Sequence, residues 1–413
     1  MKHFIYSLLI GFAVMSCSEG GAAGDPEEIE PPEVVEEEVV EFTESDNVIA
    51  GQMKSFNVEF FKAVNKVAKE DENVLVSPLS ASILLSMLAN ATNQETSAEI
   101  LDVLGCKDLN ALNVLSHKYL TLLPEIDGTT TMCFANSVWY QKGYSLNTTF
   151  QKVLADYFDA ETFSRQLQTN DPVVIKEVND WVSDKTEGLI PSIIKDLPET
   201  SLAIFINAQY FKGAWANPFD ADETEKKEFY GVDDTTTVDM MYKSGMQHYC
   251  ETDLYKGVMM EFGNGAFEAV MILPNEGVSF DEVLASDELY SINSHRYLDL
   301  DIEYYLPKFK LEPDEIDITK NLAEMGIESI YKWQYKYLFS APVLSMGISI
   351  RQKATIEFTE KGAEGSTVTW TPPIWLGSEA PEPVVVNFNR PFMFFINETN
   401  TGAMLFAGKV VKL

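Results

Sequence analysis

The run SLAIFINAQYFKG at residues 201–213 places apolar side chains on both parities of an extended chain. Successive residues of a strand point to opposite faces of a sheet, so a strand with this pattern is covered on both faces. Strand composition and short turns, mostly typical of antiparallel pairs, also mark residues 129–140, 265–274, 298–311, 347–358, 384–397 and 403–413. The sequence therefore predicts a sheet with layers on both sides and further strands towards the C-terminus.

Two early segments predict helices. Residues 55–69 carry apolar side chains at three- and four-residue spacing, namely Phe56, Phe60, Val64 and Val67. Residues 77–91 begin with Ser77-Pro78, a cap and a first-turn proline, and are apolar nearly all round, which predicts a buried helix. Helices early and strands late indicate a mixed α+β class. The absence of a repeat or a compositional break after about Val48 predicts one folded unit.

The first residues, MKHFIYSLLIGFAVMSC, combine Lys2, an apolar run of about a dozen residues and a small residue before Cys17. This pattern predicts a signal peptide over residues 1–16. The run Val14-Met15-Ser16-Cys17 resembles a bacterial lipobox, in which the cysteine becomes the diacylated first residue of the mature protein. The alternative is an ordinary signal peptide with an incidental cysteine.

An acidic segment follows at residues 17–46. Between Ser18 and Asp46 it holds twelve Asp or Glu, three Pro and no Lys or Arg. Such a segment repels itself and buries too little apolar surface to fold, so we expect a disordered tether. The whole chain carries a net charge of −34, and −23 remains once Lys2 and these twelve acids are set aside. This excess argues against nucleic acid or anionic lipid as a partner.

Motifs of catalytic and metal sites are missing from the sequence. It has no G-x-S-x-G elbow and no P-loop, and Gly263 and Gly265 predict a hairpin turn. The cysteines and histidines outside the leader show no ligand-like spacing: Cys106, Cys133, Cys250, His117, His248 and His295. No nucleophile, base and orienting residue can be named together. We therefore expect no enzymatic activity, no metal and no cofactor.

Seven stretches in collinear order resemble one family. They are NVLVSPLSASILLSML (73–88), NDWVSDKTEGLI (179–190), INAQYFKGAWANPFDADET (206–224), MILP (271–274), LPKFKLE (306–312), FNRPFMFFI (388–396) and GAMLFAGKV (402–410). Together they resemble the serpins, a family of serine protease inhibitors, over roughly Val48 to Leu413. The resemblance implies an α+β serpin domain at 47–413. Its helices pack around a large central, mostly antiparallel sheet with two smaller sheets, and a reactive-centre loop is exposed at about 360–386.

The resemblance also assigns a polar cluster under the central sheet where that sheet opens. Ser77, Ser80 and Asn207 match its positions, and Trp215 matches an aromatic residue at the upper end of the sheet. The family often adds a histidine, whose place Gln352 takes here. An amide both donates and accepts hydrogen bonds, so the cluster can persist without a titrating group.

The loop itself is bait for a protease in this family, and its first half inserts into the sheet after cleavage. The hinge residues implied here are Glu360, Gly362, Ala363, Glu364, Gly365, Ser366 and Thr367. One parity of the segment holds small or β-branched residues, from Ala363 to Thr371, which suits a strand that enters a sheet. Two features depart from the family pattern. Gly365 adds backbone conformational entropy that is lost when the segment becomes a strand, and Pro372-Pro373 removes ladder hydrogen bonds at the far end of that strand.

Two bonds are candidates for cleavage. Family spacing counted forward from Glu360 selects Leu376-Gly377, and spacing counted back from Phe388 selects Ala380-Pro381. We favour Leu376-Gly377, because proline disfavours cleavage on its amino side. Leucine at this position points to chymotrypsin-like, elastase-like or subtilisin-like targets, with papain-like cysteine proteases as a further class.

The function expected from the resemblance is suicide inhibition of a serine or cysteine endopeptidase, trapped as an acyl-enzyme by a monomeric inhibitor. A non-inhibitory serpin that binds or carries a partner is the alternative, and Pro372-Pro373 and the absent hinge threonine favour it. With Cys17 as lipid anchor, we expect an outer-membrane lipoprotein. The sequence leaves open whether it faces the periplasm or the cell exterior.

Overall fold

The computed structural model describes residues 41–197, 201–291, 297–313, 316–331, 337–341, 347–362 and 383–413. These residues belong to one compact unit, Val40–Leu413. The predicted signal peptide, Cys17, most of the acidic tether and loop residues 363–382 lie outside the described residues.

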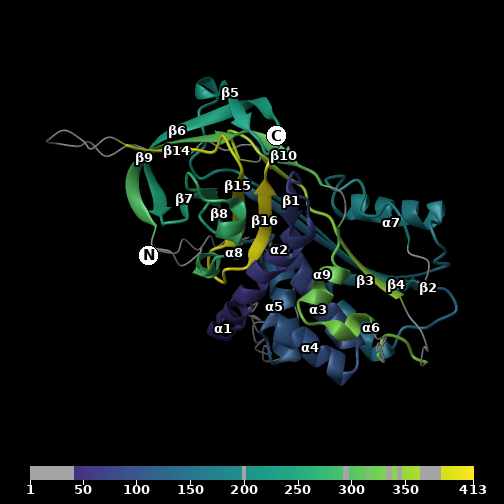
Figure 1. Ribbon diagram of the computed structural model, residues 1–413. Helices are drawn as coiled ribbons and strands as arrows, with labels where there is room; N and C mark the ends of the chain where they lie inside the picture. The colour runs from purple at the N-terminus through teal and green to yellow at the C-terminus, as the bar shows by residue number, and fades with distance from the viewer. Residues whose placement is uncertain are drawn as a thin grey trace, which may run out of the picture. The chain divides into compact units, whose positions relative to one another are not determined.

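Helices dominate the first half of this unit (Figure 1). In the first half they are α1 (Glu44–Gln52), α2 (Lys54–Val67), α3 (Pro78–Ala91), α4 (Gln94–Leu104), α5 (Leu109–Leu122), α6 (Thr148–Phe158) and α7 (Pro172–Lys185). Two shorter helices, α8 (Phe280–Ala285) and α9 (Thr319–Glu324), follow in the second half. Short 3-10 helices are η1 (Ala221–Glu223), η2 (Asp287–Ser291) and η3 (Glu328–Tyr331). Ser77 caps α3 by accepting a hydrogen bond from the Ser80 backbone, with Pro78 in the first turn, as the sequence predicts.

One sheet has five strands in the order β11-β12-β4-β2-β3. Their bounds are β2 (Thr130–Gln141), β3 (Ala160–Arg165), β4 (Ser201–Gly213), β11 (Ile316–Asp317) and β12 (Gly347–Gln352). A separate pair, β10 (Phe309–Leu311) with β13 (Ile356–Phe358), continues the β11–β12 pairing in a register that differs by one residue. The pairs β12–β4 and β2–β3 are parallel and the pairs β11–β12 and β4–β2 are antiparallel, so this sheet is mixed.

The larger sheet has the order β1-β16-β15-β8-β7-β6-β9-β14, with β5 paired to β6. All its pairs are antiparallel except β14–β9. Its strands are β1 (Val74–Val76), β5 (Glu225–Tyr230), β6 (Thr235–Glu251), β7 (Tyr255–Phe262), β8 (Phe267–Pro274), β9 (Leu298–Pro307), β14 (Val384–Asn387), β15 (Phe392–Glu398) and β16 (Met404–Val410). Strands β8, β15 and β16 are buried along their whole length, which places the main core against this sheet.

Strand β4 is covered on both faces, as its apolar pattern predicts. Its residues Ala203 and Phe205 belong to the main core, which also contains the buried helix α3. The opposite parity, Ile204 and Ile206, packs in a second cluster with α7, which contributes Val178 and its neighbours. The continuous apolar run of this strand therefore follows from its two covering layers.

Two sequence-based expectations fail near the N-terminus. The tether predicted to reach residue 46 ends earlier, because α1 begins at Glu44. Thr43 and Asp46 form a capping box there, and the Asp46 carboxylate lies 2.5 Å from Nζ of Lys118 on α5, so an acid counted as solvated is buried in an ion pair. Val67, expected on the buried face of α2, is 51% exposed.

Candidate functional site at the end of strand β13

Strands β4 and β12 are parallel neighbours that pair along only part of their length. Their ladder runs from Ser201 opposite Gly347 to Ile206 opposite Arg351. Beyond it β4 continues to Gly213 with β2 as its partner, while β13 pairs with β10. Among the described residues, the next β-bridge between these two stretches of chain is the Ala214–Gly362 bridge, just beyond the end of β4. Residues 207–213 therefore have no ladder on their β13 side with any strand that the structure describes.

The chain reverses direction immediately after β13. The Gly362 backbone donates to the carbonyl of Thr359 at 3.1 Å, and the Thr359 hydroxyl donates to the carbonyl of Gly362. Gly362 also forms an antiparallel bridge with Ala214, which directly follows β4. At Gly362 the backbone is therefore antiparallel to the end of β4 and, because β12 is parallel to β4, antiparallel to the direction of β12 as well.

Gly362 makes this reversal sterically possible. Its φ is +83°, in the left-handed region that favours glycine. A Cβ added there would lie 2.4 Å from the carbonyl oxygen of Gly213 and 2.5 Å from the backbone nitrogen of Trp215. The close approach of the turn to the end of β4 therefore depends on the missing side chain.

Glu360 anchors the turn from the other side. Its carboxylate lies 3.0 Å from Nζ of Lys308, the Thr224 hydroxyl donates to it at 3.3 Å, and its carbonyl accepts from the Phe219 backbone at 2.7 Å. Burial acts to raise the pKa of Glu360, but a hydrogen bond from its own backbone together with Lys308 and Thr224 outweighs burial and holds the pKa below its ordinary value.

Trp215 closes the upper end of the site. Its backbone N–H donates to the carbonyl of Lys361 at 3.1 Å, and its indole N–H donates to the carbonyl of Thr359 at 3.0 Å. The ring stacks on Phe262, with centroids 4.3 Å apart, and contacts Phe358 at 5.7 Å. Trp215 thus ties the hinge turn to the end of β4.

The predicted polar cluster forms where the β4–β12 ladder ends. Gln352 accepts from the Ser77 backbone N–H at 2.9 Å and donates to the Ser77 carbonyl at 2.7 Å. The hydroxyls of Ser77 and Ser80 donate to Oε1 of Gln209 on β4, at 2.8 and 3.0 Å. These residues are at most 2% exposed, so the start of α3 joins the two parallel strands through buried, uncharged hydrogen bonds.

Asn207 does not join this group. It donates to Asn136 on β2 at 2.6 Å, and Asn136 in turn donates to the carbonyl of Phe158. Gln209, which the sequence reasoning missed, takes the expected place. The signal was present, because Asn207 and Gln209 are polar residues of the same parity in an otherwise apolar run.

The structure also locates the glycines and cysteines that the sequence analysis singled out. Gly263 and Gly265 lie in the turn between β7 and β8 with φ of 44° and 86°, which confirms the hairpin. Cys106, Cys133 and Cys250 are free thiols. Among the described residues no group of His, Cys, Asp and Glu could hold a metal ion. Within the same residues, no helix combines the length and the apolar character needed to cross a membrane.

The remaining loop assignments lie outside the described residues. They are the hinge positions Ala363, Glu364, Gly365, Ser366 and Thr367, and both candidate bonds, Leu376-Gly377 and Ala380-Pro381. They stay predictions.

Comparison with known proteins extends the resemblance to nearly the whole folded unit. The family model described as serpin (serine protease inhibitor) matches residues 51–413. Antichymotrypsin-2 of Bombyx mori is 29% identical over 376 residues, which cover 89% of this chain and 98% of that protein. Corticosteroid-binding globulin of Oryctolagus cuniculus is 31% identical over 357 residues, 83% of this chain and 90% of that protein.

Among solved structures, the thermophilic serpin tengpin in its native state is 25% identical with a TM-score of 0.79. The match covers 91% of this chain and 96% of that one. The predicted fold class, helices with a large sheet and smaller sheets, is therefore confirmed.

Proposed function

The chain belongs to the serpin family, and from that premise we propose that it is a suicide inhibitor of a serine endopeptidase, with cysteine endopeptidases as a further target class. The observation that carries the proposal is the turn Thr359–Gly362, which sets the backbone at Gly362 antiparallel to the end of β4, a strand that is itself parallel to β12. A strand that runs antiparallel to two parallel neighbours can form antiparallel ladders with both of them.

In the proposed reaction the serine hydroxyl of the protease attacks the carbonyl of Leu376. The bond to Gly377 breaks, its amine takes the proton, and Leu376 remains as an ester on the protease. The new end at Leu376 then travels with its attached protease as the segment from the hinge inserts between β4 and β12, first beside residues 207–213 and then through the ladder that joins the two strands. About fifteen residues at ~3.3 Å each displace the protease by roughly 50 Å.

Strand insertion supplies the driving force. It adds roughly ten ladder hydrogen bonds at about 1 kcal/mol net each, together with apolar burial. The native fold is then metastable relative to the cleaved form. Distortion of the protease site blocks attack by water on the ester, so the inhibitor needs no catalytic residue of its own.

Incubation with chymotrypsin, pancreatic elastase and subtilisin tests the proposal on a denaturing gel. We expect a covalent band whose mass is the sum of protease and inhibitor minus the released peptide, and mass mapping that places the cut after Leu376. Thr367→Glu is the matched variant, because it places a charge where the inserted strand enters the sheet. Only clipped product with all three proteases refutes inhibition of these classes.

A second function has specific support. The relative named corticosteroid-binding globulin is 31% identical, and this chain has Pro372-Pro373 in the loop and Ala363 in place of the family's hinge threonine. A carrier of this kind would be clipped without forming a covalent complex. If clipping raises the Tm, the cleaved loop has inserted into the sheet. If clipping leaves the Tm unchanged, the native fold does not store the energy on which trapping depends.

For location, we propose that Cys17 carries a lipid and that the acidic segment before α1 holds the domain away from an outer membrane. The lipobox-like run Val14–Cys17 and the ten acids between it and α1 support this proposal. Expression of the full chain in a Gram-negative host should incorporate labelled palmitate, and Cys17→Ala should abolish the label. Equal labelling of the two proteins would refute the anchor.

A further inference from the structure

A pocket of about 730 Å³ shares no lining residue with the hinge turn Thr359–Gly362. The end of α2 and the residues after it, helix α8, and the ends of β8, β15 and β16 contribute to its walls. Its volume falls in the range of sites that hold small organic molecules. Phe280, Leu284, Val278 and Pro391 are among the apolar residues that form the larger part of its surface.

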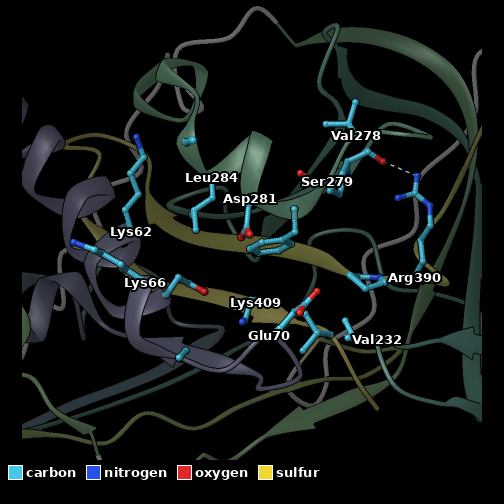
Figure 2. Close-up of a pocket in the computed structure, with 17 residues that line it drawn as sticks. Lys62, Lys66, Glu70, Val232, Val278, Ser279, Asp281, Leu284, Arg390 and Lys409 are labelled. Carbon is cyan, nitrogen blue, oxygen red and sulfur yellow. Dashed lines mark hydrogen bonds between the residues drawn. The ribbon is translucent and has the colours of Figure 1, made fainter.

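Four cations line this pocket, in a chain whose folded part is strongly acidic. Figure 2 shows Arg390 at one end, Lys62 and Lys66 at the other, and Lys409 between them. Lys62 and Lys66 pair with Glu59 and Glu324, at 3.6 and 3.8 Å. Lys409 and Arg390 form no ion pair with any residue that the structure describes.

These two cations use only part of their hydrogen-bonding capacity. Lys409 is 5% exposed and donates to the carbonyl of Lys69 at 3.0 Å, while Arg390 donates to the carbonyl of Pro274 at 2.5 Å. An ammonium has three donors and a guanidinium five, so several remain for a ligand. Burial lowers the pKa of both groups, because each positive charge has lost water without gaining an anionic partner in contact.

The acids that line the pocket are not ion-pair partners of Lys409 or Arg390. Glu70 and Asp281 line it, and both are exposed. Together with Asp71 and Glu72 they favour the charged form of Lys409 at a distance, although none of the four makes an ion pair with it. Lys409 is therefore the buried charge of the pocket, and the acids around it are solvated.

We propose that this pocket binds a small amphipathic organic anion, a carboxylate joined to a hydrocarbon body. The carboxylate accepts from Arg390 and Lys409, and the body packs on Phe280, Leu284 and the prolines. Arginine suits this role because its planar fork matches the two carboxylate oxygens. The ring of Phe280 lies 5.9 Å from Nζ of Lys409, so apolar and cationic contacts are available side by side.

Isothermal titration of the full folded protein with octanoate tests the site, with 1-octanol as the uncharged match and inorganic phosphate as the anion without a hydrocarbon body. We expect a Kd below about 1 mM for octanoate and at least tenfold weaker binding of the other two. Arg390→Gln and Lys409→Met should each weaken octanoate binding roughly ten- to a hundredfold, because each removes a charge-assisted hydrogen bond.

Lys412→Gln is the matched control, since Lys412 is exposed, pairs with Asp71 and lies outside the pocket. It should leave octanoate binding unchanged. Arg390→Gln decides the test if Lys409→Met fails to fold. No heat of binding up to several times the expected Kd, equal binding of 1-octanol or phosphate, or undiminished binding by Arg390→Gln would each overturn the proposal. The readout is independent of protease trapping, so failure here leaves the proposed inhibition untouched.

Discussion

Replacing Gln352 with leucine should destabilise the protein by removing both hydrogen bonds that its amide makes to the Ser77 backbone. Those bonds measure 2.9 and 2.7 Å, and Gln352 is 2% exposed. Leucine has a similar volume, so the main cost is the buried Ser77 N–H left without a partner, whereas the Ser77 carbonyl keeps its hydrogen bond from the Ala81 backbone. At about 1–3 kcal/mol for the unpaired N–H and about 0.5–1.5 kcal/mol for the second lost bond, the free energy of unfolding should fall by about 1.5–4.5 kcal/mol.

The expected shift in melting temperature follows from the size of the unit Val40–Leu413. An unfolding entropy of roughly 0.8 kcal/mol/K for a unit of this size converts the loss into a Tm lower by roughly 2–6 °C. Calorimetry at one scan rate measures it, with Gln151→Leu on the exposed face of α6 as the matched control. If Gln352→Leu melts within about 1 °C of the parent and the control, the Gln352–Ser77 connection does not stabilise the native fold.

Three further changes have defined outcomes. Glu268 is 8% exposed, and burial, reinforced by Glu261 and Glu398, raises its pKa to about 7 from 4.5. Because the folded pKa of Glu268 exceeds its unfolded value, the stability that its protonated form contributes is fully present below pH ~4.5 and is lost as pH rises through about 7. Glu268→Gln should therefore flatten the pH dependence of the free energy of unfolding measured by urea titration, and should stabilise the protein at pH 8 by at most about 3 kcal/mol. Glu360→Gln should cost about 1 kcal/mol by breaking the ion pair with Lys308, and a cost that high salt does not reduce would contradict that origin. Gly362→Ala should lower the Tm and the yield of covalent complex through at least about 1–2 kcal/mol of backbone strain, and wild-type values for both would show that the turn tolerates a side chain.

Local sequence patterns determined much of the secondary structure. Ser77-Pro78 predicted the start of α3, because a cap and a first-turn proline act within one turn of helix. The apolar run at residues 201–213 predicted a strand covered on both faces, and Gly263 and Gly265 predicted a hairpin turn. In each case residues only a few positions apart carry the information.

The tertiary structure alone decided which distant residues meet. Periodicity assigns a side chain to a face but not to a partner, so Gln209 rather than Asn207 receives the hydroxyls of Ser77 and Ser80. An acidic segment looks solvated until the fold places Lys118 beside Asp46. The parallel pairing of β4 with β12, and the point where it stops at Arg351, likewise depend on contacts between segments far apart in the chain. Short-range steric and hydrogen-bonding rules determine elements, whereas register and partners are set only when the whole core is packed.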